Sequence, residues 1–333
     1  MATIDAQVLR EMIKQFRVLI IGRANAGKTT ILHKVCNTTD KPEIYDTKGH
    51  KINAAVVESS IKRGNHDIRN EMVFKSNPGL VFHDSCGFEA GSEEEFEDMK
   101  SFISERANAT RLEDRLHAIW YCIPMDDHWR TFQRSEEKFF SECDTGHSEF
   151  SGLFSYALLG LNDPSSVPVI VVFTKFEALR PIAFGELKKQ LKGASGEERS
   201  RMIAQRVEEL FTNTGVLDRL CAPDNRARPK SHVRLANMDK PDTNCNLLLE
   251  HTTLALDNKE LQLCLISTQQ SNLELCIKCA VRTIVHRLLL PGPTNFEVDQ
   301  YEITKWFPHL KVRRRLIHSD DALVIALMNV IHH

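Results

Sequence analysis

Residues 22–29 have the types and spacing of a loop that wraps around a phosphate chain. Their sequence, GRANAGKT, fits the pattern G-x-x-x-x-G-K-[ST] without a mismatch. Glycines let successive backbone N–H groups and the start of the following helix point at an anion. We therefore expect Lys28 to reach the β- and γ-phosphates of a nucleotide and the Thr29 hydroxyl to ligate Mg²⁺.

The rest of this loop is expected to line the phosphates, largely with backbone atoms. Asn25 lies at the bend, where it either touches the oxygen between the β- and γ-phosphates or only tolerates the turn. The context supports the motif, because an apolar run at 16–21 precedes it and a helical pattern at 28–36 follows. Besides the lysine and the threonine, the predicted nucleotide-binding residues of the loop are Gly22, Asn25, Ala26, Gly27 and Thr30.

A second motif, D-x-x-G, ends another apolar run at residues 80–83. It consists of Asp84, Ser85, Cys86 and Gly87. An aspartate at a strand end beside a phosphate loop binds Mg²⁺, usually through water, and the glycine N–H contacts the γ-phosphate. We therefore predict Asp84 as a metal ligand, and Gly87 as a catalytic group together with Lys28 and Thr29.

A third motif follows the apolar run 169–173. Thr174, Lys175, Phe176 and Glu177 resemble the [NT]-K-x-D motif with which GTPases read the base. Its carboxylate accepts from guanine N1–H and from the 2-amino group, two donors that adenine lacks. Here the last residue is Glu, one methylene longer than Asp, so the contact requires a backbone shift and the strictness of guanine selection is left open.

A fourth segment, Ser267 and Thr268, follows the apolar run 261–266, which we predict to be the last strand of the sheet. GTPases carry a loop at this point that supports the base from the side opposite the third motif. The match of residue types is loose, so the prediction that Ser267 and Thr268 bind the nucleotide rests on their position.

Apolar runs alternate with helical patterns along most of the chain, which predicts a mostly parallel α/β sheet. Residues 192–246 interrupt the alternation and are interpreted as an insertion. A helix ending before Pro291 closes the first domain, so the predicted organisation is 1–291 with this insertion, then an extension at 292–333 with an apolar helix. The predicted strands are 16–21, 54–61, 68–74, 80–83, 118–123, 167–173 and 261–266.

The four motifs, in this order, resemble the TRAFAC class of P-loop GTPases. With NPG at 77–79, HDSCGFEAG at 83–91 and STQQ at 267–270, the pattern is similar to fungal "G domain-containing" proteins over roughly residues 15–290. The resemblance implies a P-loop NTPase three-layer sandwich whose mostly parallel sheet has an antiparallel edge strand. It also implies two switch regions and binding of GTP or GDP with Mg²⁺.

Two features depart from the best-known members of this class. Ras-like enzymes place a glutamine after the D-x-x-G glycine to orient water, whereas this chain has Phe88, a hydrophobic residue as in septin-like GTPases. We therefore expect slow hydrolysis, accelerated by self-association or a partner. The γ-phosphate sensor of the first switch is also hard to assign. Ser60 is the first choice as sensor and metal ligand, followed by Ser59 and then Thr47.

Two other readings stay open beside a GTPase that switches or self-assembles. One is a GTP-binding scaffold with little turnover, which Phe88 favours. The other is a P-loop ATPase or kinase, in which the base motif is a coincidence and an arginine-rich lid closes on the substrate. The arginines that keep this reading open are Arg199, Arg201, Arg206, Arg219, Arg226, Arg228 and Arg234.

The charge and the apolar stretches of the chain indicate which kinds of partner to expect. Lysine and arginine number 43 against 45 acidic residues, a formal charge of −2, which gives no reason to expect nucleic acid or an anionic membrane. No apolar stretch approaches the roughly 18 residues that a membrane span needs. Cys276 and Cys279 form a C-x-x-C without a second pair and are expected to pack in the core. We expect a cytoplasmic protein whose partners are a guanine nucleotide and a second copy or a protein effector.

Overall fold

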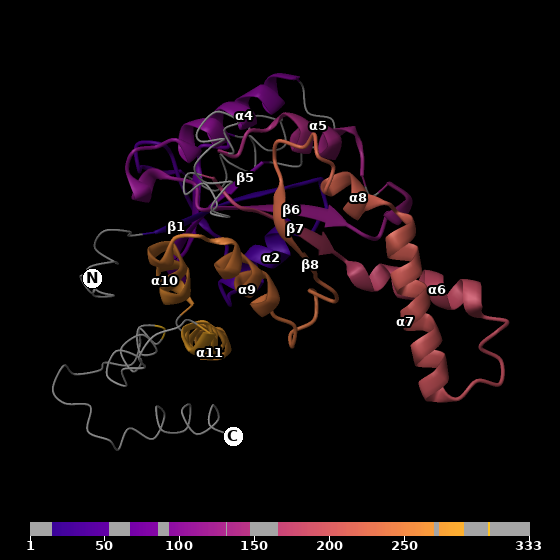
Figure 1. Cartoon of the computed structure of the whole chain (residues 1–333). Helices are drawn as coiled ribbons and strands as arrows, with labels where there is room; N and C mark the ends of the chain where they lie inside the picture. The colour runs from indigo at the N-terminus through magenta and orange to yellow at the C-terminus, as the bar shows by residue number, and fades with distance from the viewer. Residues whose placement is uncertain are drawn as a thin grey trace, which may run out of the picture.

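The computed structural model describes residues 15–52, 67–85, 93–130, 132–146, 166–269 and 273–289, together with residue 306. Over these residues the chain is an α/β structure around one mixed sheet of eight strands, in the order β3-β2-β4-β5-β1-β6-β7-β8 (Figure 1). The predicted α/β class and the mostly parallel sheet are confirmed. The strands are β1 (Phe16–Gly22), β2 (Glu43–Tyr45), β3 (Lys51–Ile52), β4 (Glu71–Phe74), β5 (Asn77–Asp84), β6 (Ala118–Pro124), β7 (Val169–Thr174) and β8 (Pro229–Arg234).

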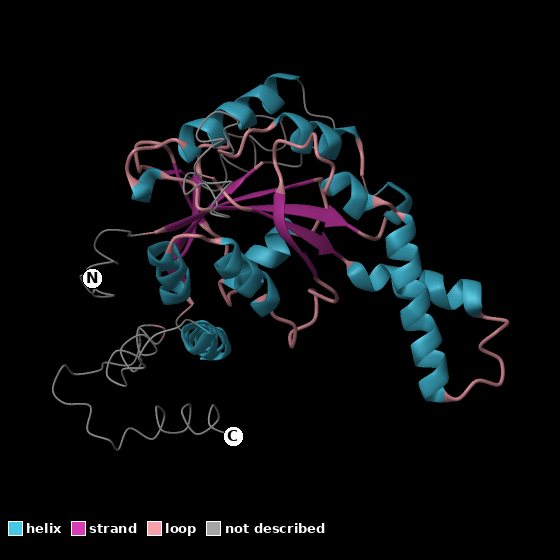
Figure 2. Cartoon of the chain, viewed as in Figure 1, coloured by secondary structure: helices cyan, strands magenta, loops and turns pink. Residues whose placement is uncertain are grey.

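Helices cover both faces of this sheet (Figure 2). The α-helices are α2 (Lys28–Val35), α4 (Glu93–Ala107), α5 (Arg134–Glu142), α6 (Leu179–Leu187), α7 (Gly196–Asn213), α8 (Val216–Leu220), α9 (Asn246–Ala255), α10 (Lys259–Thr268) and α11 (Leu273–Leu289). The short 3-10 helices are η1 (Leu112–Asp114), η2 (His128–Arg130) and η3 (Phe176–Ala178).

The strands β5, β1, β6, β7 and β8 run parallel. Because β1, β6 and β7 lie between two helical layers, every residue in them is buried, which explains their almost continuous apolar sequences. In register, Ile20 lies beside Asp84 of β5, and Gly22 lies beside Cys122 of β6. The loops that follow the parallel strands therefore emerge together at one edge of the sheet.

The other end of the sheet is antiparallel. β4 pairs antiparallel with β5, β2 with β4, and β3 with β2. The sequence predicted one antiparallel edge strand, and the structure has three strands in this part. The predicted strand 68–74 corresponds to β4, while the predicted strand 54–61 lies outside the described residues.

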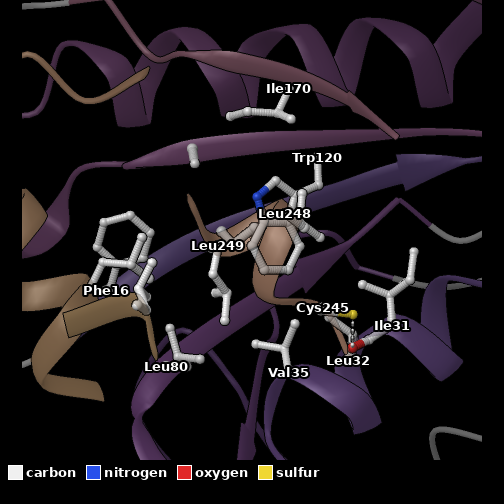
Figure 3. Packing of buried hydrophobic residues seen from close by; sticks show 14 of the residues in the cluster. Phe16, Ile31, Leu32, Val35, Leu80, Trp120, Ile170, Cys245, Leu248 and Leu249 are labelled. Carbon is white, nitrogen blue, oxygen red and sulfur yellow. Dashed lines mark hydrogen bonds between the residues drawn. The ribbon is translucent and has the colours of Figure 1, made fainter. Parts of the chain in front are cut away.

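Alternate residues of the parallel strands pack into two separate cores. From β1, Val18 and Ile20 face the core under α2, α9, α10 and α11, and Leu19 and Ile21 face the core under α4, α5 and α8. Figure 3 shows the first core, where Trp120 and Leu248 lie close to each other. The Trp120 indole donates to Thr252 Oγ1 at 3.0 Å, so its N–H is paired although the ring is fully buried.

The last predicted strand, 261–266, is wrong, because these residues lie within α10. Asn258 precedes this helix, and its Oδ1 accepts from the N–H groups of Glu260 at 2.7 Å and Leu261 at 3.0 Å. An Asn cap of this kind starts a helix. The apolar run that follows buries Leu265 and Ile266, and a short buried helix cannot be told from a buried strand by periodicity alone.

The last parallel strand is β8, which lies inside the predicted insertion 192–246. It pairs with β7 at the end of the sheet and begins at Pro229, a position that tolerates proline. α6, which precedes this segment, and α7, which lies within it, form a hairpin that projects from the body at the right of Figure 1. The hairpin has a small core of its own, made of Ala183, Leu191, Ile203 and Leu210.

Of the predicted extension 292–333, only Trp306 is described. Its indole N–H donates to Thr283 Oγ1 of α11 at 2.8 Å, and the residue is 4% exposed. Among the helices that the structure describes, none is long and apolar enough to cross a membrane.

Candidate functional site

Residues 22–29 connect the end of β1 to the start of α2, as the motif requires. Gly22 has no room for a side chain, since a Cβ there would lie 2.5 Å from the carbonyl oxygen of Cys122. Asn25 has φ 60° and Gly27, the residue before α2, has φ 80°. Both values lie in the left-handed region. The loop therefore doubles back over the helix N-terminus, where unpaired N–H groups favour an anion.

Lys28 is held inside this loop. Its Nζ donates to the carbonyl oxygen of Gly22 at 2.8 Å and to that of Arg23 at 3.4 Å. The same nitrogen lies 3.7 Å from Oδ1 of Asp84. The structure therefore brings the predicted lysine and the predicted metal-binding carboxylate together, and only 9% of Lys28 is exposed.

Asp84 is the last residue of β5. The next residue is still hydrogen-bonded to β1, since the Ser85 N–H donates to Ile20 O at 3.2 Å. The Ser85 hydroxyl is buried without a hydrogen-bond partner. Next to Asp84, burial and the charge of Arg17 lower the pKa of His83 to about 3, so its ring is neutral near pH 7. His83 therefore adds no positive charge at the end of β5 near pH 7.

Three residues predicted as site residues or switch candidates lie outside the described part of the chain. These are Gly87 and the switch candidates Ser59 and Ser60. Thr47 is described and exposed, in the turn between β2 and β3. In the sheet order, β2 is separated from β1 by β4 and β5, so Thr47 is not brought to the phosphate loop.

The base motif follows β7 at the same edge of the sheet. Thr174 is 3% exposed, and its Oγ1 has no hydrogen-bond partner. A Cβ built at Gly27 would lie 4.0 Å from the Thr174 Cβ, so the phosphate loop and the base motif are neighbours. Lys175 has φ 53°, and its Nζ donates to Asp126 Oδ2 at 2.6 Å.

Glu177 contacts a loop that the sequence analysis missed. Its Oε2 accepts from the backbone N–H of Asn237 at 2.8 Å, and the Phe176 N–H donates to Leu235 O at 3.0 Å. The loop that starts at Leu235 follows β8, so the chain after the last parallel strand does lie beside the base motif. The missed signal was the alternation of buried Val233 and Leu235 with polar neighbours, which indicates a half-buried strand.

Ser267 and Thr268 are not brought to this site. A Cβ at Gly79 would lie 3.0 Å from the Thr268 methyl carbon, and Gly79 belongs to the start of β5, at the edge opposite the phosphate loop. The Ser267 hydroxyl donates to Cys264 O at 2.7 Å, and that of Thr268 donates to Leu265 O at 2.6 Å. Both hydroxyl protons are thus used within α10.

The remaining predicted residues lie on or next to α2. Ala26 is buried, and its N–H donates to Arg23 O at 3.1 Å, which closes the loop. Thr29 follows Lys28 in the first turn of α2. Thr30 lines a groove of about 1380 Å³ that also includes Met238 of the loop after β8. The predicted contacts of these residues with a nucleotide stay predictions.

The described residues contain no group of three or more His, Cys, Asp or Glu side chains that could hold a metal ion by themselves. A Mg²⁺ site with one or two protein oxygens and the rest from phosphates and water does not need such a group. Cys276 and Cys279 pack in the core as predicted, and burial raises the pKa of each thiol to about 11.

Comparison of the chain with protein-family models finds no match, and comparison with curated proteins finds none either.

Proposed function

We propose that the chain binds a guanine nucleotide with Mg²⁺ at the edge where β1, β5 and β7 end, and hydrolyses it slowly, as a GTPase of the P-loop fold. The observation that carries the proposal is Lys28. Its ammonium group is held 3.7 Å from the Asp84 carboxylate by two loop carbonyls, at the start of a helix whose N–H groups favour phosphate.

The shape of the loop supports a phosphate ligand. Gly22 lets the end of β1 lie directly against the Cys122 carbonyl of β6, and the left-handed backbone of Asn25 and Gly27 turns the loop back toward the start of α2. Two hydroxyl groups beside it, those of Ser85 and Thr174, are buried without hydrogen-bond partners. Orphaned polar groups of this kind cost stability unless a ligand or water satisfies them.

The chemistry of the donors fits Mg²⁺. Thr29 and Asp84 would supply a hydroxyl and a carboxylate, hard oxygen ligands of the kind that Mg²⁺ prefers. When bound, the ion neutralises charge on the phosphate oxygens. Lys28 would bind phosphate oxygens with its ammonium group, and Asp84 would hold the ion with its carboxylate, directly or through water.

The base motif supports guanine. Glu177 is held by the Asn237 N–H through one oxygen, Oε2, which leaves Oε1 for a donor on a base. Guanine presents N1–H and an amine where adenine has an acceptor and no amine. A longer carboxylate fixed from the loop after β8 can therefore serve in place of the Asp of the family motif.

Two of the seven arginines on which the kinase alternative depends form ion pairs in or beside the α6–α7 hairpin. Arg206 pairs with Glu186 and Glu209, and Arg234 pairs with Glu208. These contacts favour a structural role for the two arginines in the hairpin and its base over a role in a catalytic lid.

The test is competition of a fluorescent GTP analogue by unlabelled GTP, GDP and ATP in the presence of Mg²⁺. We expect GTP and GDP to compete at least about tenfold better than ATP, a difference of about 1.4 kcal/mol. Glu177→Ala is expected to remove this preference, while Glu197→Ala, at an exposed position on α7, keeps it. Equal competition by ATP in the unchanged chain would refute the guanine assignment.

Turnover is measured separately, over hours, against Lys28→Ala. Hydrolysis that exceeds this variant supports the GTPase. Binding with no turnover above the variant supports the GTP-binding scaffold, and rapid hydrolysis by the dilute chain alone contradicts the slow reaction expected from Phe88.

A further inference from the structure

The connection between β6 and α5 contacts both loops of the proposed site. At its start, Asp126 Oδ2 accepts from Lys175 Nζ of the base motif at 2.6 Å. Just after its end, Oε1 of Glu136 lies 3.1 Å from Nε of Arg23 in the phosphate loop. One short stretch of chain, 125–136, therefore makes an ion pair with each of the two loops.

The pair between Arg23 and Glu136 is deeply buried. Glu136 is 0% exposed and Arg23 is 5% exposed. Oε2 of Glu136 accepts from the Gln133 N–H at 2.9 Å and from the Ser135 hydroxyl at 3.0 Å, which fixes this carboxylate to the start of α5. Since a buried charge without its counter-ion is strongly unfavourable, Arg23 is constrained to follow Glu136.

The pair between Asp126 and Lys175 is partly exposed, with 44% and 35% of the side chains accessible. Lys175 also has a left-handed backbone, with φ 53°, a conformation that residues other than glycine seldom adopt. Lys175 is followed two residues later by Glu177, so a shift of the lysine moves the carboxylate that is proposed to read the base.

Between the two pairs lies Trp129, which is 71% exposed. The centroid of its ring lies 4.8 Å from the centroid of the His128 ring, within η2. The other two tryptophans of the chain, Trp120 and Trp306, are 0% and 4% exposed. A movement of this connection therefore changes the surroundings of one indole, which makes it observable by fluorescence.

We propose that residues 125–130 and 132–136 hold the phosphate loop and the base motif in a fixed relative position, with Asp126 and Glu136 as positioning residues for Lys175 and Arg23. The inference rests on the proposed nucleotide site. It deepens that proposal by naming two carboxylates that act through other side chains. It also predicts that nucleotide binding changes the environment of the Trp129 indole.

The exposed pair is tested with fluorescent GDP and Mg²⁺. We expect Asp126→Asn to bind about two- to fivefold more weakly, the range of a single partly exposed ion pair. Asp126→Glu restores binding, and the control Asp218→Asn, at an exposed position on α8, leaves it unchanged. In the presence of Lys175→Met, Asp126→Asn has no further effect, because its partner is gone. Full additivity of the two losses overturns a positioning role for Asp126.

The buried pair needs a second design, because Glu136→Gln alone leaves the Arg23 charge uncompensated and can prevent folding. Arg23→Met combined with Glu136→Gln removes both charges at similar volume. The folded double variant is expected to bind GDP at least about tenfold more weakly, a loss of about 1.4 kcal/mol. The exposed control Glu137→Gln binds like the unchanged chain. Undiminished binding by the folded double variant overturns a positioning role for Glu136.

Fluorescence separates this inference from the proposal on which it rests. We expect GDP to change tryptophan emission in the unchanged chain, and we expect Trp129→Phe or Asp126→Asn to remove most of that change. A chain that binds no guanine nucleotide overturns the proposed function and this inference together. A chain that binds it with the same affinity and the same emission change in every variant overturns this inference alone.

Discussion

At the scale of single residues, the motif positions were the most predictable part of the site. Lys28 and Asp84 come together within 3.7 Å, although 56 residues separate them in sequence (84 − 28). Both could be found because each motif follows an apolar run that has to be a buried strand. The contact of Asn237 with Glu177 could not be predicted, because it uses a backbone N–H, which almost every residue has.

Gly22 offers the sharpest test of the loop at this scale. In Gly22→Ala the new Cβ meets the Cys122 carbonyl oxygen at 2.5 Å, and φ is 150°. We expect the free energy of unfolding to fall by about 1–3 kcal/mol, as for strained backbone positions, and nucleotide affinity to fall with it. Urea denaturation measures the first effect. Gly185→Ala is the control, since nothing lies within 4 Å of its Cβ in α6, and helical Ala is expected to be neutral or stabilising. Equal stability of the two variants would contradict the packing described for Gly22.

At the scale of elements, the buried parallel strands β1, β5, β6 and β7 were predictable and the last parallel strand, β8, was not. A strand buried on both faces is a run of apolar residues, as in β1 and β7, and such runs are visible in a sequence. β8 lies at the end of the sheet and is mostly polar, so its composition resembles a loop. The apolar run that was taken for its counterpart, 261–266, is a buried helix, and only its cap at Asn258 distinguishes it from a strand.

Asn258 tests that explanation. Asn258→Ala removes an acceptor for two N–H groups at the start of α10 and is expected to lower the free energy of unfolding by about 1 kcal/mol. Asn258→Asp keeps the acceptor and is expected to keep the stability. Both are measured by urea denaturation near pH 7. No difference between Ala and Asp would mean that packing of the apolar face, without the cap, determines where the helix begins.

A second test at this scale concerns the segment before β6. His117 Nδ1 accepts from the Arg17 N–H at 2.9 Å, and its Nε2 lies 2.8 Å from Leu112 O, so the neutral ring joins β1 to η1. Burial is the main cause that lowers the pKa of His117 to about 4. The unfolded chain binds this proton near pH 6.5 and the folded chain does not, so stability falls as the pH drops below about 6.5.

At pH 5 the His117 contribution to this loss is about 2 kcal/mol, from about 1.5 pH units at about 1.36 kcal/mol each. The measurement is urea denaturation at pH 7.5 and pH 5. We expect His117→Gln to be less stable at pH 7.5 but to lose less stability on acidification than the unchanged chain. His50→Gln, at an exposed turn position, is expected to leave the loss unchanged. An equal loss in the unchanged chain and His117→Gln would rule out this histidine as a source of acid sensitivity.

At the scale of the whole molecule, the direction of the strands is what assembles the site. Because β1, β5, β7 and β8 are parallel, the phosphate loop, Asp84, the base motif and the loop after β8 all emerge at one edge. Strand direction followed from the alternation of apolar runs and helical patterns. The contribution of the last strand did not, since it required knowing that residues 229–234 close the sheet.

A ligand that binds at this edge touches loops from both halves of the parallel sheet, so it is expected to stabilise the fold as a whole. By mass action, a ligand at 100 times its dissociation constant adds about 2.7 kcal/mol to the free energy of unfolding. We therefore expect GDP with Mg²⁺ to raise the midpoint of thermal unfolding by several degrees, and a chelator to reverse much of the shift. Lys28→Ala and Asp84→Ala are expected to abolish it, while Glu197→Ala, at an exposed position on α7, preserves it. A shift of equal size with Lys28→Ala would mean that the nucleotide binds elsewhere on the molecule. It would refute the proposal that the edge where the parallel strands end is the nucleotide site.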